Sequence, residues 1–549
     1  MAKTVIVGGV AAGMSTATRL RRLDESAQIV VLEAGSHVSF ANCGLPYYVG
    51  GVIEERDSLL LQTPQSLAAR FGLDVRVNTR ALSIDPHART VLICAPDGSQ
   101  YTEHYDSLVL APGARPAVPM VSGAERALTL RDIADVDRLS HAIEAASTAV
   151  ILGAGFVGLE LAENLVRKGL QVTVVELAPQ VLGALDAELA VRIHDALTGA
   201  GVAVHTGARV DSISATHANI VTADGQALSV PADVVIAAIG VRPDSQLAVH
   251  AGVEVNSAGA IVTDGAGRTS VPGIFAAGDV AAKTDAVSGS ERSIPLANLA
   301  NREGRRVADA IAGREPSPRA SMGTAIVSVF GVVAAIVGAN ERILAQSGRS
   351  LRVIHSHPLD HAGYYPGATQ MALKLIVDAD TDQILGAQAV GGAGVDKRID
   401  VIATAMAGGL RASDLADLEL AYAPEFGSAK DPVNMLGYIA QNALSGLSPT
   451  VQWNELSALE PAAIIDVRSP QEHARGTVDG SVNIPLDELR SRHTELPEQG
   501  RIVVHCQVGQ RGHSATRLLR QLGYDAVNLD GGWLTYRDGL RSTIASRAS

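Results

Sequence analysis

Short apolar runs alternate with glycine-rich turns and amphipathic stretches along most of this chain. One arrangement occurs twice, at residues 5–33 and again at residues 150–176: an apolar strand, a glycine turn, a helical stretch and a second apolar strand that ends in an acid. The acid follows the last glycine of its turn by 20 residues in the first copy and by 18 in the second. This order and spacing are typical of a dinucleotide-binding βαβ unit. The pattern therefore predicts two such units in one chain.

Each turn has the residue types that a dinucleotide phosphate requires. Small side chains let the backbone approach the pyrophosphate, whose charge is stabilised by the N-terminus of the following helix. The acid at the end of the second strand is placed to accept hydrogen bonds from a ribose. The candidates for the first site are Gly8, Gly9, Val10, Ala11, Ala12, Gly13 and Glu33, and those for the second are Gly153, Gly155, Phe156, Val157, Gly158 and Glu176.

Further buried strands and turns are predicted beyond these units. Residues 233–240 predict a buried strand ending in a glycine turn, which adds Gly240 to the cofactor-binding candidates. The apolar run 325–339 is shorter than the roughly 20 residues of a membrane helix, so we expect two buried strands that turn at Gly331. The other elements expected in this region are antiparallel strands at 371–377 and 384–390 and a helix at 396–410.

Composition and charge narrow the class of protein. The chain has 549 residues, of which 47% are hydrophobic and 19% charged, so three or four folded domains are expected. The net charge of −13 argues against a nucleic-acid or anionic-membrane partner. Three cysteines, Cys43, Cys94 and Cys506, make no disulfide framework, and no basic-then-apolar leader is present. These features predict a cytoplasmic protein.

Residues 1–445 resemble the flavoprotein disulfide reductases that bind two dinucleotides, the family of glutathione reductase. Two further segments match flavin-domain signatures of that family, Leu110-Ala111-Pro112-Gly113-Ala114 and Ala277-Gly278-Asp279. The resemblance implies FAD in the first unit, NADH or NADPH in the second, and a homodimer formed by a C-terminal interface domain. It adds Ala111, Pro112, Gly113, Gly278 and Asp279 to the FAD-site candidates.

Cys43 selects a branch of this family. It has no partner at C-x4-C spacing, and the segment 39–48 is similar to that of the coenzyme A-disulfide reductases. NADH oxidases and peroxidases also use one cysteine but usually have a histidine at the position of Val10. The resemblance implies that Cys43 is the redox centre and that Tyr364 (or the adjacent Tyr365) and Tyr422 lie near the sulfur of the partner subunit. Residue chemistry alone slightly favours tyrosines that only pack the dimer interface, and the resemblance reverses that preference. Cys94 is expected to be structural.

Several residues are candidates for binding the substrate. Arg19 and Arg22 share a helix face; they could clamp the phosphates of coenzyme A or simply stabilise a helix C-terminus. Coenzyme A would then be a substrate or a bound carrier. The other candidates are Ser39, Asn42, Asn301 and Lys430. Glu176 would repel a 2′-phosphate, which favours NADH, although NADPH stays possible.

Residues 453–549 resemble a rhodanese domain. The segment Ile464-Ile465-Asp466-Val467-Arg468 matches its first signature, and a buried strand then leads into the loop from Cys506 to Arg511. Backbone N–H groups and a helix N-terminus would stabilise a thiolate or persulfide there. Arg511 follows the cysteine by five positions, whereas cysteine phosphatases place it six after, so the shorter loop favours sulfur chemistry.

The expected fold class is α/β, with two Rossmann-like units, an α+β dimerisation domain and an α/β rhodanese domain. The expected boundaries are 1–113 plus 245–323 for the FAD domain, 114–244 for the NAD(P)H domain, 324–445 for the dimerisation domain, 446–452 for a linker, and 453–549 for the rhodanese domain.

The resemblance implies a flavoenzyme that uses NAD(P)H to reduce coenzyme A disulfide, persulfide or polysulfide and couples this to sulfur transfer. Its partners are small thiols, disulfides or persulfides. Three alternatives stay open: an NADH oxidase that cycles Cys43 through a sulfenic acid, a sulfurtransferase with a regulatory flavin module, and a redox sensor.

Overall fold

The computed structural model describes residues 2–317 and 320–548. The chain forms two compact units. The first comprises residues 1–175, 209–221 and 227–323, and the second comprises residues 176–208, 222–226 and 324–549. No helix in the described part of the chain is long and apolar enough to cross a membrane.

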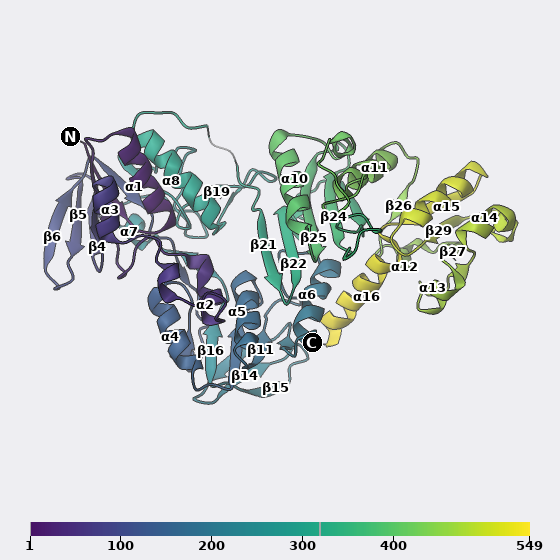
Figure 1. Cartoon of the computed structure of the whole chain (residues 1–549), viewed down its shortest axis with the longest axis horizontal. Coiled ribbons are helices and arrows are strands. Elements are labelled where there is room, and N and C mark those ends of the chain that lie inside the picture. Colours follow the sequence, from purple (N-terminus) through teal and green to yellow (C-terminus); the bar gives the residue numbers. More distant parts are fainter. Residues whose placement is uncertain (1, 318–319, 549) are drawn as a thin grey trace. The chain divides into compact units, whose positions relative to one another are not determined.

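The first unit contains a parallel sheet in which β1 lies between β2 and β7. Its strands are β18 (Ile274–Ala276), β7 (Ser107–Leu110), β1 (Lys3–Val7), β2 (Gln28–Leu32) and β3 (Asp74–Arg76), in that order. The side chain of Ile6 packs on one face, against α1 (Ala11–Leu23) and α8 (Ala297–Ile311), which lie side by side (Figure 1). Val5 and Val7 face the opposite side. Burial of both faces explains the unbroken apolar runs of the sequence.

The second dinucleotide unit has the same local order. Strand β10 (Thr148–Leu152) lies between β11 (Gln171–Val175) and β16 (Val234–Ala237), and all three run parallel. Helix α5 (Phe156–Arg167) follows β10 directly and buries its apolar side. The unit's other elements are α4 (Ile133–Ile143) and β9 (Ala127–Leu128), with an antiparallel sheet of β13 (Arg209–Ile213), β14 (His217–Val221) and β15 (Ala227–Pro231). The first compact unit also holds the helices α2 (Leu45–Val49), α3 (Pro64–Phe71) and α7 (Gln246–His250). It further contains an antiparallel sheet of β4 (Arg80–Asp85), β5 (Thr90–Cys94) and β6 (Gln100–His104).

The second unit contains an antiparallel sheet in the order β21-β22-β25-β24-β23. Its strands are β21 (Ala325–Val329), β22 (Val332–Gly338), β23 (Leu351–Ser356), β24 (Ala372–Asp378) and β25 (Ile384–Gly391), and the associated helices are α9 (Glu341–Leu344), α10 (Val395–Gly408) and α11 (Pro432–Leu444). The strand pair that turns at Gly331, the later antiparallel pair and the helix are all confirmed.

The same unit holds a parallel sheet in the order β26-β30-β29-β27-β28. Its strands are β26 (Thr450–Val451), β27 (Ala463–Asp466), β28 (Val482–Asn483), β29 (Arg501–His505) and β30 (Asp525–Leu529), and its helices are α12 (Leu456–Leu459), α13 (Pro470–Ala474), α14 (Leu486–Arg492), α15 (Gln510–Gln521) and α16 (Gly532–Ala548). Helix α15 begins at Gln510, within the loop that the sequence predicted from Cys506 to Arg511. Helix α16 packs against α6 (Ala187–Gly199), and Arg192 of α6 donates from Nε to Asp538 at 3.0 Å.

Candidate active sites

The first glycine turn is packed so closely that side chains cannot replace its glycines. A Cβ on Gly8 would lie 2.1 Å from the carbonyl oxygen of Ala111, and a Cβ on Gly13 would lie 1.9 Å from that of Gly8. Gly8 also has a φ of +105°, which favours glycine. The turn after β1 is therefore pressed against the segment that contains Ala111, Pro112 and Gly113.

Glu33 braces this turn. Its carboxylate accepts the N–H of Gly9 at 2.7 Å with one oxygen and the N–H of Gly35 at 2.7 Å with the other. The sequence predicted a ribose partner for Glu33, and the structure adds a role in holding the turn itself. The remaining lone pairs of the two oxygens are available to hydroxyl donors.

Helix α1 begins without a side-chain cap and without an acid in its first turn. By contrast, α3 and α4 begin with side-chain caps from Thr63 and Asp132. The backbone N–H groups of an uncapped first turn need an acceptor, and a pyrophosphate is one that suits the positive end of the helix. Residues Val10 to Gly13 therefore fit an anionic dinucleotide.

Gly278 and Asp279 follow β18, where a buried ion pair holds the backbone. Glu303 accepts the Gly278 N–H at 2.8 Å, and Lys283 donates to the Gly278 carbonyl at 2.6 Å. Lys283 and Glu303 are themselves 3.0 Å apart, with little side-chain exposure. Both sides of the Gly278 peptide are thereby fixed next to Asp279. The sequence analysis missed this pair.

The second turn repeats the close packing of the first. A Cβ on Gly158 would lie 2.1 Å from the carbonyl oxygen of Gly153, and Gly153 has a φ of +102°. Helix α5 begins at Phe156 after Gly155, again without a side-chain cap or an acid in its first turn. Val157 is largely exposed on that turn. Gly240 has a φ of +103° in the turn that follows β16. Glu176, which belongs to the second compact unit, accepts the Ala178 N–H with its carboxylate at 2.7 Å.

Cys43 lies in a short 3₁₀ turn, Asn42–Gly44, that leads into α2, and the residue is exposed. Partial burial of the thiol raises its pKa, and the nearby carboxylates of Glu160 and Asp279 raise it further. Tyr47 donates its hydroxyl to Glu160 at 3.0 Å. Burial in turn raises the pKa of the Glu160 carboxyl. The protein's own charges therefore favour a thiol at Cys43, and the sequence analysis had identified neither Glu160 nor Tyr47.

The segment before Cys43 is tied to the first glycine turn. Ser39 has a φ of +48°, an unusual conformation for a serine, and its N–H donates to the Gly9 carbonyl at 2.8 Å. Asn42 donates from Nδ2 to the Arg131 carbonyl at 3.2 Å. The structure thus ties Ser39 to the first glycine turn and Asn42, the neighbour of Cys43, to Arg131.

The substrate-binding candidates on α1 and α8 differ in their exposure and in their hydrogen-bond partners. Arg19 donates twice to Asp309, at 2.7 and 3.0 Å, so its charge is matched within the protein. Arg22 is exposed. Asn301 accepts the hydroxyl of Ser15 at 2.7 Å. Arg22 is thus more accessible than Arg19, and a phosphate-binding role for either arginine stays a prediction.

In the second unit, the hydroxyls of Tyr364 and Tyr422 lie 2.9 Å apart. Both side chains are exposed, and their hydrogen bond raises the pKa of Tyr364. Tyr365 instead packs edge to face against His361, with 5.7 Å between the ring centroids. Lys430 is exposed in the same unit. The pairing with Tyr422 favours Tyr364 over Tyr365 as the acidic phenol, a role that stays a prediction.

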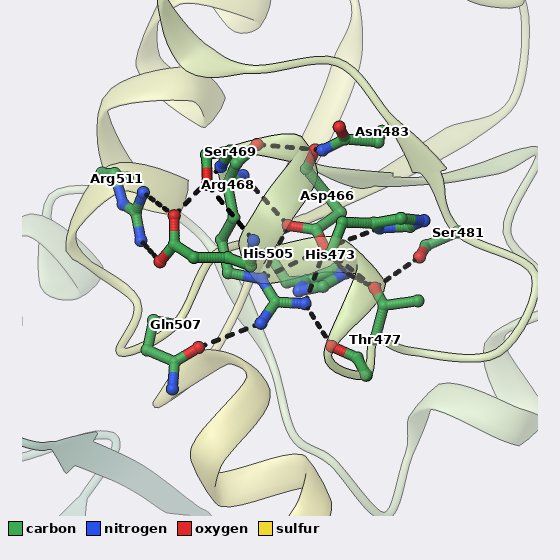
Figure 2. Close-up of polar contacts among 12 residues, drawn as sticks. Asp466, Arg468, Ser469, His473, Thr477, Ser481, Asn483, His505, Gln507 and Arg511 are labelled. Atoms are coloured by element: carbon green, nitrogen blue, oxygen red, sulfur yellow. Dashed lines mark hydrogen bonds and ion pairs between the residues drawn. The ribbon is translucent and has the colours of Figure 1, made fainter.

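Cys506 is fully buried at the end of β29, in a loop held by side chains from three other segments. Arg468 donates to the Gln507 side chain at 2.9 Å and to the Asp466 carboxylate at 2.7 Å (Figure 2). The backbone N–H of Trp533 donates to the Cys506 carbonyl at 2.8 Å. Arg511 forms a two-point ion pair with Glu472, at 2.8 and 2.6 Å. The hydrogen bonds that Arg511 donates to Glu472 raise the pKa of Arg511, and the Cys506 sulfur adds to this effect.

A buried network in the second unit was not predicted from the sequence. The ring of His355 on β23 bonds to Asp530 at 2.7 Å through Nδ1 and to Glu188 of α6 at 3.0 Å through Nε2. Lys374 of β24, also buried, contacts Glu188 at 2.5 Å and Asp186 at 2.8 Å. Lys374 occupies the space between these carboxylates, so the cluster reads as an ion-pair network rather than a metal site.

Family models match almost the whole chain. Residues 2–304 match pyridine nucleotide-disulphide oxidoreductase, residues 324–432 match the dimerisation domain of that family, and residues 448–538 match the rhodanese-like domain. A coenzyme A disulfide reductase from Staphylococcus aureus is 33% identical over 445 residues, which cover 80% of this chain and all of that protein.

Two solved structures are similar over nearly the full length. The structure of reduced Bacillus anthracis CoADR-RHD is 43% identical with a TM-score of 0.96, covering 98% of each chain. The structure of a NAD-dependent persulfide reductase from A. fulgidus is 38% identical with a TM-score of 0.91, covering 97% of this chain and 100% of that one. The family implies FAD and a pyridine nucleotide as cofactors, which both uncapped glycine turns fit. The chain belongs to the pyridine nucleotide-disulphide oxidoreductases and carries a C-terminal rhodanese-like domain.

Proposed function

We propose that this enzyme takes electrons from NADH and reduces coenzyme A disulfide, coenzyme A persulfide or polysulfide at Cys43, while Cys506 transfers sulfane sulfur. The observation that supports this most is the presence of two cysteines in two different kinds of site. Cys43 is exposed beside the dinucleotide turns, and Cys506 is buried in a cradle of loop backbone and arginines. A relative with both parts over its full length is a NAD-dependent persulfide reductase.

Each reduction balances in atoms and electrons with NADH and one proton. Reduction of a disulfide by NADH and a proton gives two thiols, and reduction of a persulfide gives one thiol and hydrogen sulfide. Bound FAD would supply the two-electron transfer between the nicotinamide and Cys43. The residues of the turns around Gly8 and Gly278 would hold it.

Cys43 attacks the sulfur–sulfur bond as a thiolate, so its proton must first leave. The raised pKa of Cys43 and the neighbouring Glu160–Tyr47 hydrogen bond make that pair a route for the proton. We further propose a homodimer in which Tyr364 and Tyr422 of one copy protonate the thiolate that leaves at Cys43 of the other. Glu176 favours NADH, because its charge repels the 2′-phosphate of NADPH.

The test is steady-state NADH oxidation with coenzyme A disulfide, coenzyme A persulfide, polysulfide and oxygen in parallel. We expect turnover with the sulfur substrates and little with oxygen alone. Cys43→Ser should abolish it while FAD stays bound, and Cys94→Ser is the matched control. Oxygen consumption that exceeds sulfur reduction would instead identify an NADH oxidase.

A further inference from the structure

The two arginines beside Cys506 are each matched by a carboxylate. Arg468 is buried against Asp466, to which it donates from Nε and Nη2 (Figure 2). Arg511 has both terminal nitrogens on Glu472, and its hydrogen bond lowers the pKa of the Glu472 carboxyl to about 2. At neutral pH both pairs are therefore fully charged and internally balanced.

The neighbouring histidine adds no charge to this balance. Burial lowers the pKa of His505 to about 4, so its ring is neutral at neutral pH. An anion on Cys506 is stabilised by Arg511, whose pKa the Cys506 sulfur raises, and by the backbone N–H groups of the loop and of the start of α15, where Gly509 provides no side-chain cap. That arrangement suits one negative charge on sulfur.

The Arg511–Glu472 pair is the part of the cradle that an incoming donor meets. Their side chains are 39% and 32% exposed, whereas Cys506 is fully buried. A donor that carries its own anionic group next to the transferred sulfur would need a cation at this position. Arg511 is the partly exposed arginine of the cradle, but both of its terminal nitrogens already donate to Glu472.

We propose that Glu472 sets donor specificity, so that the Cys506 loop accepts sulfur from persulfides or polysulfides and discriminates against thiosulfate. This inference rests on the proposed sulfur transfer and names the class of its donor. The Cys506 thiolate attacks the outer sulfur of R–S–SH. A bond forms between Cys506 and the outer sulfur, the sulfur–sulfur bond of the donor breaks, and the thiolate R–S⁻ leaves; the outer sulfur keeps its proton.

Thiosulfate would react by the same displacement, with sulfite as the leaving group. It differs in bringing two negative charges towards a thiolate, whereas a protonated persulfide brings none. Releasing Arg511 from Glu472 would supply the missing positive charge. The sign of the effect is therefore fixed: removing the Glu472 charge should favour thiosulfate selectively.

The experiment compares sulfur transfer to cyanide from glutathione persulfide and from thiosulfate by the full-length protein. We expect the wild type to prefer the persulfide in kcat/KM. Glu472→Gln should raise kcat/KM for thiosulfate by about tenfold and change that for the persulfide by less than about twofold. The glutamine oxygen can still accept the Ser469 N–H, which Glu472 accepts at 3.0 Å. Glu495→Gln, which breaks an exposed pair with Arg492, is the matched control.

Two results would overturn the inference: a wild type that uses both donors equally well, or a Glu472→Gln protein with native circular dichroism and an unchanged donor ratio. A wild type whose kcat/KM does not favour the persulfide overturns the inference even if Glu472→Gln does not fold. If the wild type accepts sulfur from neither donor yet still reduces coenzyme A disulfide, the proposed sulfur transfer fails, and this inference fails with it.

Discussion

Raising the pH through about 9 should weaken the attachment of the rhodanese domain within the second unit. His355 is fully buried, and both of its ring nitrogens face carboxylate oxygens, on Asp530 and Glu188. Burial opposes the charged ring, but the hydrogen bonds to Asp530 and Glu188 outweigh it and raise the His355 pKa to about 9. Lys374, which faces the same Glu188, opposes this only in part.

The size of the effect follows from the shift. The pKa rises from 6.5 to about 9 on folding, which corresponds to about 3 kcal/mol of stability. Because the folded-state pKa is the higher one, this stability is fully present below pH 6.5 and is lost as the pH rises through about 9. Above that pH, one ring nitrogen of His355 would present its lone pair to a carboxylate oxygen of Asp530 or Glu188.

The chain offers a selective probe for this prediction. Its two tryptophans, Trp453 and Trp533, both lie in the rhodanese domain, so their fluorescence reports unfolding of that domain. Urea unfolding of wild type and His355→Gln should differ by roughly 3 kcal/mol near neutral pH and converge by about pH 10. His513→Gln, which changes a histidine of the rhodanese domain itself, should leave the wild-type profile between about pH 7 and 10 intact. Parallel curves for wild type and His355→Gln would refute the reasoning.

Three further outcomes are expected. NADH should be preferred over NADPH because of Glu176. A tenfold preference for NADPH, about 1.4 kcal/mol, would show that Glu176 does not repel the 2′-phosphate. Cys506→Ala should remove sulfur transfer and leave coenzyme A-disulfide reduction largely intact; equal loss of both, measured on FAD-loaded protein, would contradict separate sites. Lys283→Met should weaken FAD binding, measured by equilibrium dialysis, because it removes the buried cation that bonds to both Glu303 and the Gly278 carbonyl; unchanged affinity would remove the positioning role of Lys283.

The sequence predicted those parts of the fold that depend on local chemistry. Gly8 and Gly153 were recognisable because a tight strand-to-helix turn needs glycine, and the strands around Gly331 because apolar runs of that length suit buried strands. Cys43 and Cys506 were recognisable because their flanking segments are distinctive. The comparisons confirm the family and the fold class, while the individual site roles and domain boundaries stay predictions.

Contacts between distant segments could not be predicted in this way. The partner of Arg511 lies 39 residues away, and the two contacts of His355 lie 167 and 175 residues away. One local signal was present: Lys374 lies in the otherwise apolar run of β24, and a lone charge in such a strand requires a buried partner. The sequence could thus indicate that a partner exists, but not which one.

The packing of α16 on α6 has a consequence for how this protein is synthesised. Arg192 emerges from the ribosome 346 residues before Asp538, its partner on the last helix. At about 5–20 residues per second, roughly 20–70 s pass before that helix exists. During this interval the side of α6 that later packs on α16 lacks that helix, and Arg192 lacks Asp538. Nascent chains that lack the C-terminal helix should therefore be the species that chaperones retain, and stalling translation late in the message should trap them.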